Sequence, residues 1–182
     1  MPELLTLELL DRLDRTLRDV GAAIVDRWKP GLTREQMNVL TEPYGFRLPD
    51  EAALWWAWHN GAGKGSELTP DREPLALNEV MDGFELEQGA MSDACGLTRL
   101  VGVVSEQPWL WFDCRVASAA FVPVYAGYKS GQPWVVAESI GDMVLALIAA
   151  FETGYFTTDE HGEWNEVDWD KVPDTISESG IV

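Results

Sequence analysis

Residues 46–65 of the chain, FRLPDEAALWWAWHNGAGKG, decide its fold. Pro49 suits the first turn of a helix, and the two acids that follow it match the positive end of the helix dipole. Gly61 suits the left-handed residue that ends a helix. Apolar side chains lie on two sides of the segment between them, including Trp55, Trp56 and Trp58. A short helix with two apolar sides is buried between layers, so we expect these tryptophans in the core rather than in a ligand-stacking platform.

A longer helix is predicted before this segment, within residues 1–30. Its apolar residues recur every three or four positions along one stripe, formed by Leu10, Leu13, Leu17, Val20, Ile24 and Trp28. The opposite side places an acid four residues before a base, an orientation that stabilises a helix, at Glu8/Arg12, Asp11/Arg15 and Asp14/Arg18. Lys29-Pro30-Gly31 ends the helix, because Pro30 disfavours helical geometry before it. Thr33, with Gln36 three residues later, then begins a short capped helix.

Strand patterns follow in the second half of the chain, at residues 100–104, 109–114, 121–126 and 133–137. The last two flank GYKSG, which suits a hairpin connection. Pro123 cannot donate a ladder hydrogen bond, so its strand is either an edge or begins at the proline. Ser139 with Asp142 then caps a helix that Gly154 ends. This order predicts an α+β fold: a small, mostly antiparallel sheet with helices packed on one face, an N-terminal helix, and a helix after the last hairpin.

Charge is spread unevenly along the chain without dividing it into domains. The 182 residues include 31 acids and 13 bases, a net charge of −18. Eleven of the acids and a single base, Lys171, fall in residues 130–182. We expect one domain, with an N-terminal helix over residues 1–30, a body over 31–160 and an acidic C-terminal tail over 161–182. So acidic a protein repels a phosphate backbone, which argues against nucleic acid as a partner.

Neither a membrane nor an oxidising compartment is indicated. The longest apolar run, residues 144–151, is far shorter than the ~20 residues of a membrane span. The N-terminus lacks the basic region of a signal peptide. Cys95 and Cys114 make no disulfide framework, so we expect two reduced, largely buried thiols. The sequence therefore predicts a cytoplasmic protein with no membrane partner.

The motifs that would carry catalysis or ligand binding fail on spacing. GAGKGS at residues 61–66 is like a phosphate-binding loop, but glycine follows Lys64 where Ser or Thr is required. DEHGEWNEVDWD at residues 159–170 lacks the ligand spacing of an EF-hand. The histidines are His59 and His161, and no nucleophile motif accompanies them. We expect no catalytic residues, no cofactor and no metal site.

The acidic segment at residues 159–170 is instead a candidate for binding a partner. An excess of negative charge steers a basic protein toward it through long-range attraction. We assign the partner contact to the six carboxylates Asp159, Glu160, Glu163, Glu166, Asp168 and Asp170. A different class remains open: a carboxylate-based hydrolase that uses Glu163, Glu166 and Asp168, for which these acids would have to surround a cleft.

Three stretches resemble the SMI1/KNR4, or SUKH, family. TREQMNVLTEPYGFRLPDEAALWWAWHNG, residues 33–61, is similar to the family's short helix, its Gly-x-x-Leu-Pro step and its helix ending in Asn-Gly. FVPVYAG, residues 121–127, and SIGDMVLALIAAFETGYF, residues 139–156, are similar to its last strands and closing helix. The resemblance covers about residues 30–160 and leaves the N-terminal helix outside.

The resemblance implies a binding protein with no shared active site. Bacterial members of this family are commonly immunity proteins that neutralise toxins, often nucleases, whereas fungal members regulate cell-wall synthesis and signalling. We therefore expect a non-catalytic immunity protein that binds a basic toxin domain through its acidic surface. The alternative is a regulatory interaction module of the SMI1/KNR4 type, which acts in cell-wall or signalling control.

Overall fold

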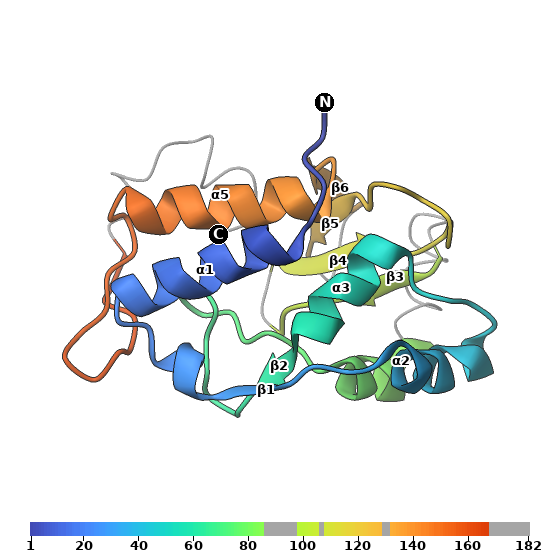
Figure 1. Cartoon of the computed structure of the whole chain (residues 1–182), viewed down its shortest axis with the longest axis horizontal. Coiled ribbons are helices and arrows are strands. Elements are labelled where there is room, and N and C mark those ends of the chain that lie inside the picture. Colours follow the sequence, from blue (N-terminus) through green and yellow to red (C-terminus); the bar gives the residue numbers. More distant parts are fainter. Residues whose placement is uncertain (86–97, 106–107, 129–131, 168–182) are drawn as a thin grey trace.

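A four-stranded antiparallel sheet, covered on one face by helices, forms the body of the protein (Figure 1). The computed structural model describes residues 1–85, 98–105, 108–128 and 132–167. In chain order the elements are α1 (Leu7–Asp19), the 3-10 helix η1 (Ala23–Asp26), β1 (Trp28–Pro30), α2 (Arg34–Thr41), the 3-10 helix η2 (Glu42–Tyr44), α3 (Asp50–Trp58), β2 (His59–Ala62), β3 (Leu100–Gly102), β4 (Trp109–Asp113), β5 (Val124–Gly127), β6 (Trp134–Ala137) and α5 (Ile140–Glu152). Residues 77–85 are also helical.

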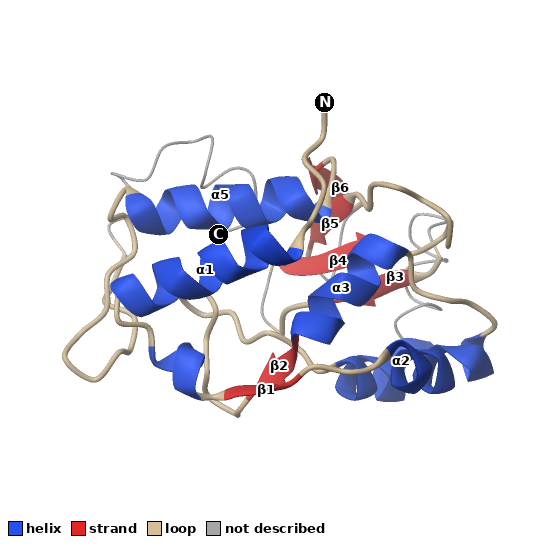
Figure 2. Ribbon diagram, in the orientation of Figure 1, coloured by secondary structure: helices blue, strands red, loops and turns tan. Residues whose placement is uncertain are grey.

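The main sheet has the strand order β3-β4-β5-β6, so each strand pairs with its neighbour along the chain. The register places Val101 opposite Phe112, and Trp111 opposite Tyr125. α1 packs along α5 in the layer of helices, with α3 beside them (Figure 2). β1 and β2 form a separate two-stranded sheet. The prediction of an α+β fold, with one helix before the sheet and one after the last hairpin, is confirmed.

The first helix is shorter than its apolar stripe predicts. α1 begins after Thr6 and ends at Asp19. Gly21 follows with a φ of +78°, in the left-handed region that commonly ends a helix. The prediction of a helix that continues to Lys29 is therefore wrong, because the chain passes through η1 into β1 instead. The apolar spacing persists past the helix because Ile24 still packs in the core, at 1% exposure.

The central helix forms where the sequence predicts it, but the chain beyond it differs. α3 is followed directly by β2, so His59 lies on a strand. Gly61 is left-handed, with a φ of +73°, yet it lies inside β2 rather than at a helix end. A Cβ on Gly61 would come within 2.6 Å of the backbone nitrogen of Ala76. Glycine is thus required here by the close approach of two segments.

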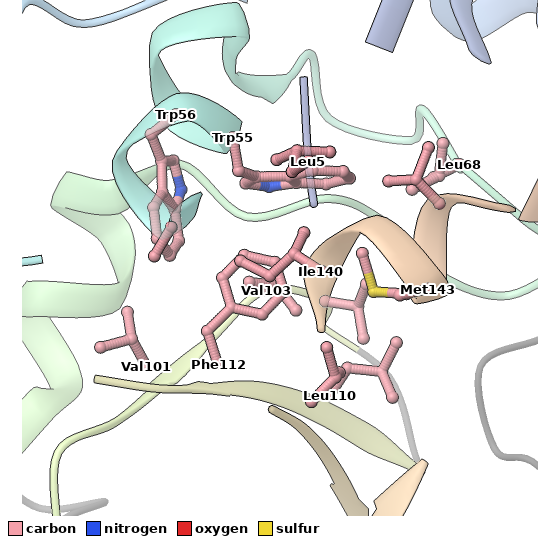
Figure 3. Close-up of a cluster of buried hydrophobic side chains, with 14 of the residues drawn as sticks. Leu5, Trp55, Trp56, Leu68, Val101, Val103, Leu110, Phe112, Ile140 and Met143 are labelled. Atoms are coloured by element: carbon pink, nitrogen blue, oxygen red, sulfur yellow. The ribbon is translucent and has the colours of Figure 1, made fainter. Parts of the chain in front are cut away.

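Large buried side chains meet between α3, α5 and β4 (Figure 3). Phe112 of β4 has no exposed surface, and its ring lies 5.8 Å from that of Trp55 and 5.5 Å from that of Trp56, measured between centroids. Ile140, at the start of α5, joins the same cluster. The prediction that these tryptophans belong to the core is confirmed for Trp55 and Trp56, whereas Trp58 is half-buried.

A buried carboxylate joins three segments to the central helix. Glu51, in the first turn of α3, is 3% exposed. Its Oε1 accepts the N–H groups of Leu5 and Gly141, each at 3.0 Å, and its Oε2 accepts that of Val122 at 2.6 Å. The N-terminal segment, the approach to β5 and the start of α5 are tied together in this way. Both oxygens of the buried charge have partners, so Glu51 is a structural group.

The other helix starts follow the prediction, and β5 pairs with β6 in antiparallel fashion, while residues 129–131 of the predicted GYKSG connection lie outside the described residues. Thr33 and Gln36 form a capping box at the start of α2, and the Ser139 hydroxyl accepts the N–H of Asp142 at the start of α5. β5 begins after Pro123 and lies inside the sheet, so the proline precedes the strand and does not mark an edge.

Within the described ranges, every helix is too short or too polar to cross a membrane.

Candidate protein-binding surface

The chain after α5 folds back onto the body. Trp164 stacks on Phe151 of α5, with 5.4 Å between ring centroids and an interplanar angle of 10°. The Trp164 indole N–H also donates to the backbone oxygen of Glu67 at 3.1 Å. Residues 161–167 of the expected acidic tail are held against the body by this anchor, at the orange-to-red end of the chain in Figure 1. Residues 168–182 lie outside the described residues.

Asp159 fixes the turn that presents the acids of this loop. Its Oδ1 accepts the N–H groups of His161 at 2.8 Å and Glu163 at 3.1 Å. The N–H of Asp159 donates to the carbonyl of Glu163 at 2.9 Å. The N–H donors lower the pKa of the Asp159 carboxyl, because they favour its charged form. Asp159 therefore holds the loop in shape as well as carrying charge.

Gly162 docks the same turn onto the N-terminal part of the chain. Its carbonyl accepts the N–H of Ala23 at 2.8 Å, and its φ is +80°. A Cβ on Gly162 would lie 2.6 Å from the backbone oxygen of Gly21, so a larger residue would require movement of one of the segments. The backbone that carries Glu160 and Glu163 is thus fixed within the turn and against η1.

A second acidic loop, residues 63–73, lies against this turn. The carboxylate of Glu67 accepts the N–H of Asp71 at 3.2 Å. Partial burial raises the pKa of Glu67, and the nearby charges of Asp71, Glu163 and Glu73 raise it further, against the lowering effect of that hydrogen bond. Carboxylates from the two loops are therefore close enough to repel one another.

We call the carboxylates of the two loops the acidic face, formed by Glu67, Asp71, Glu73, Asp159, Glu160, Glu163 and Glu166. Three bases accompany them. Arg27 pairs with Glu163 at 3.2 Å, Lys64 is exposed, and Arg72 is 5% exposed. Burial lowers the pKa of Arg72 to about 10, so it stays charged at neutral pH. Seven acids against three bases give this face a formal charge of −4.

Four of the six predicted contact residues lie in the described part of the chain: Asp159, Glu160, Glu163 and Glu166. The Asp159 turn holds Glu163 near Glu67 of the second acidic loop. Asp168 and Asp170 lie outside the described residues. Glu67, Asp71 and Glu73 were not predicted from the sequence. The stretch ELTPDRE at residues 67–73 carries the signal of an acidic turn, but nothing in it indicates contact with a loop so far along the chain.

His59 and Cys114 are held by packing against their neighbours. His59 stacks on Trp28 with 4.6 Å between ring centroids and an interplanar angle of 7°. Burial lowers the pKa of the His59 imidazole. Cys114 is 1% exposed, and burial raises the pKa of its thiol, which keeps it protonated and unreactive. Cys95 lies outside the described residues.

The hydrolase alternative requires its acids to surround a cleft. A cavity of about 550 Å³ beside the turn is lined by Glu160 and His161, but not by Glu163 or Glu166. Asp168 lies outside the described residues. In the part of the chain that the structure describes, no three His, Cys, Asp or Glu side chains are grouped so that they could hold a metal ion.

The acidic face combines a fixed backbone with exposed charge. Its loops are fixed by backbone hydrogen bonds and by Trp164, while Glu160 and Glu166 remain exposed to solvent. A surface of this kind is electrostatically complementary to a positively charged one. No model of a known protein family matches the chain, and no curated protein matches it.

Proposed function

We propose that the protein is a non-catalytic binding protein of the immunity type, which neutralises a basic toxin domain by covering it with the acidic face. The observation that carries the proposal is the convergence of two acidic loops whose backbones are held by Trp164 and Asp159. Because these loops are ordered before any partner arrives, little conformational entropy is lost when a complex forms.

A nuclease is the toxin class that suits this charge best. A nuclease must be positively charged where it grips phosphate, so exposed carboxylates can occupy the same surface. Arginine side chains on the partner would form bidentate pairs with carboxylates such as Glu160 and Glu166. The resemblance to the SMI1/KNR4 family supports the proposal, since bacterial members of that family commonly neutralise toxins.

Growth rescue tests the proposal in cells. The protein is coexpressed with each toxin domain encoded beside its gene, as wild type and as two variants of equal net charge. The acidic-face variant carries Glu160→Gln, Glu163→Gln and Glu166→Gln, and it keeps Asp159, which holds the turn. The remote variant carries Glu35→Gln, Asp82→Asn and Glu138→Gln, at exposed acids outside the acidic face.

We expect the wild type and the remote variant to restore growth, and the acidic-face variant to lose this protection. Equal protection by both variants would show that the acidic face does not contact the toxin. Failure of the wild type with every basic toxin domain would contradict the immunity function and favour the regulatory module. A complex that does not respond to salt would indicate an apolar contact, for which exposed side chains such as Tyr128, Trp134 and Val135 are available.

A further inference from the structure

A cavity lined by arginines lies at the other end of the molecule from the acidic face. Its volume is about 370 Å³, and it is formed by the end of α2, the loop after η2 and the adjoining ends of β3 and β4. Its lining includes Arg47, Arg99 and Arg115, three of the 13 basic residues in the chain. Figure 1 shows α2 at one end of the long axis and the loop after α5 at the other.

Arg115 is oriented before any ligand arrives. Its Nε and Nη2 donate to the two carboxylate oxygens of Asp113 at 2.8 and 2.5 Å, and Nη2 lies 3.4 Å from the Tyr125 hydroxyl. The Asp113 side chain is 10% exposed, whereas that of Arg115 is 39% exposed. A guanidinium anchored through two of its nitrogens keeps Nη1 for an acceptor in the cavity.

Arg99 has a backbone conformation that arginine usually avoids. Its φ is +61°, in the left-handed region that favours glycine. Its carbonyl accepts the N–H of Cys114 at 3.0 Å, which fixes Arg99 across from the end of β4 and next to Arg115. Strained residues of this kind are concentrated at functional sites, so this conformation is compatible with a role for Arg99 in the cavity.

Arg47 supplies the third guanidinium, from the loop after η2, which packs against the helical residues 77–85. It is exposed, and it makes no hydrogen bond or ion pair within the described ranges. The rings before it pack on Phe84, at 5.2 Å for Phe46 and 5.1 Å for Tyr44. The Tyr44 hydroxyl donates to the carbonyl of Met81 at 2.7 Å. The loop that carries Arg47 is therefore held in place on the helical residues 77–85.

Charge and size define the ligand of this cavity. Among the described residues, the three arginines of the lining against Glu42 and the Asp113 that pairs with Arg115 leave a formal charge of +1, in a chain whose net charge is −18. A volume of about 370 Å³ suits a small molecule. Three guanidinium groups offer more donors than one carboxylate accepts in a fork, whereas a phosphate group presents three terminal oxygens. We propose that this cavity binds the phosphate group of a small phosphate ester through Arg47, Arg99 and Arg115.

The binding experiment uses the full chain and three probes: phenyl phosphate, inorganic phosphate and acetate, titrated at constant ionic strength and followed by NMR of the backbone amides. We expect phenyl phosphate to bind most tightly, and acetate at least about tenfold more weakly than either phosphate. The signals of Gly45, Arg99, Cys114 and Arg115 should shift. Equal affinity for acetate would overturn the phosphate assignment, and tighter binding of inorganic phosphate would overturn the ester. Shifts confined to other residues would overturn the location.

Two substitutions, one that removes a positive charge and one that removes a negative charge, test whether binding depends on the cavity or only on the net charge of the protein. Arg47→Gln should weaken phenyl phosphate binding about tenfold, because it removes one charged donor. Glu42→Gln should strengthen binding several-fold, because it removes a carboxylate from the lining of the cavity. The matched controls Arg15→Gln and Glu35→Gln, at exposed residues outside the cavity, should each change the affinity less than about twofold.

Equal effects of each substitution and its control would overturn the site. The gain expected from Glu42→Gln cannot arise from unfolding, so the test remains decisive if Arg47→Gln folds poorly. None of these substitutions touches the acidic face, and the result is therefore independent of the proposed immunity function.

Discussion

Glu51 and the acidic face use the same chemical group in opposite settings. Glu51 is 3% exposed, and both of its oxygens accept backbone N–H groups, whereas Glu160 and Glu166 are exposed on fixed loops. A buried charge is tolerated only when its oxygens have partners, while an exposed one stays available for a partner protein. We therefore expect Glu51 to contribute to the stability of the fold, and the exposed carboxylates to contribute to binding. Substitutions at Glu51 should change the free energy of unfolding, and those on the acidic face should change association.

The largest loss of stability is expected at Glu51. Glu51→Ala leaves the N–H groups of Leu5, Val122 and Gly141 buried without an acceptor, so the free energy of unfolding should fall by about 3–5 kcal/mol. Glu51→Gln keeps the shape and one acceptor oxygen, and should lose about 1–3 kcal/mol. Denaturant unfolding followed by tryptophan fluorescence measures both. The control Glu35→Gln should lose less than about 0.5 kcal/mol, and an equally small loss at Glu51 would contradict its structural role.

A smaller loss is expected at the anchor of the acidic face. Trp164→Ala removes the stack on Phe151 and the hydrogen bond to Glu67, and because the ring is only half-buried the free energy of unfolding should fall by about 1–3 kcal/mol. The carboxylates of the acidic face are unchanged in this variant, so it tests only how their loop is held in place. Hydrogen exchange at the amides of His161 and Glu163 should become faster in Trp164→Ala and less so in Trp164→Phe. Unchanged exchange would show that the indole does not hold this loop.

The smallest effect is a dependence of stability on pH with opposite signs at two acids of the face. The pKa of Glu67 is raised in the folded state, so the folded protein gains stability from this group as pH falls from neutral through that pKa. The gain levels off below the unfolded value of 4.5. The pKa of Asp159 is lowered, so its contribution is present above the unfolded value of 3.8 and is lost as pH falls through the folded value.

Unfolding measured from pH 7 to pH 4.5 for the wild type and Glu67→Gln isolates the first of these contributions. The wild type should gain stability relative to Glu67→Gln as the pH falls. A difference that stays constant, or that reverses, would show that the Glu67 carboxylate is not crowded by its neighbours.

Local sequence signals predict the helix starts well, because a cap is specified within about four residues. The capping box of Thr33 and Gln36 is an example, and both residues make the expected hydrogen bonds. The end of α1 was missed because the apolar stripe continues through Ile24, which packs in the core without being part of that helix. The small β1–β2 sheet was missed because it pairs strands that are far apart in the sequence.

The candidate sites show the same limit. The charge count finds the acids of residues 159–166, but the bond that joins their loop to the second acidic loop links Trp164 to Glu67, 97 residues away. Arg47, Arg99 and Arg115 likewise come from separate parts of the chain, and no spacing within the sequence brings them to one cavity. Contacts of this kind arise from packing and carry no local pattern.

The most direct measurement is the association rate with the toxin domain that the growth assay selects, at a series of salt concentrations, for the wild type, the acidic-face variant and the remote variant. We expect the rates of the wild type and the remote variant to fall steeply as salt rises. At low salt the acidic-face variant should associate about tenfold more slowly, with a weaker dependence on salt. Equal rates and equal salt dependence for the two variants would contradict recognition through the acidic face.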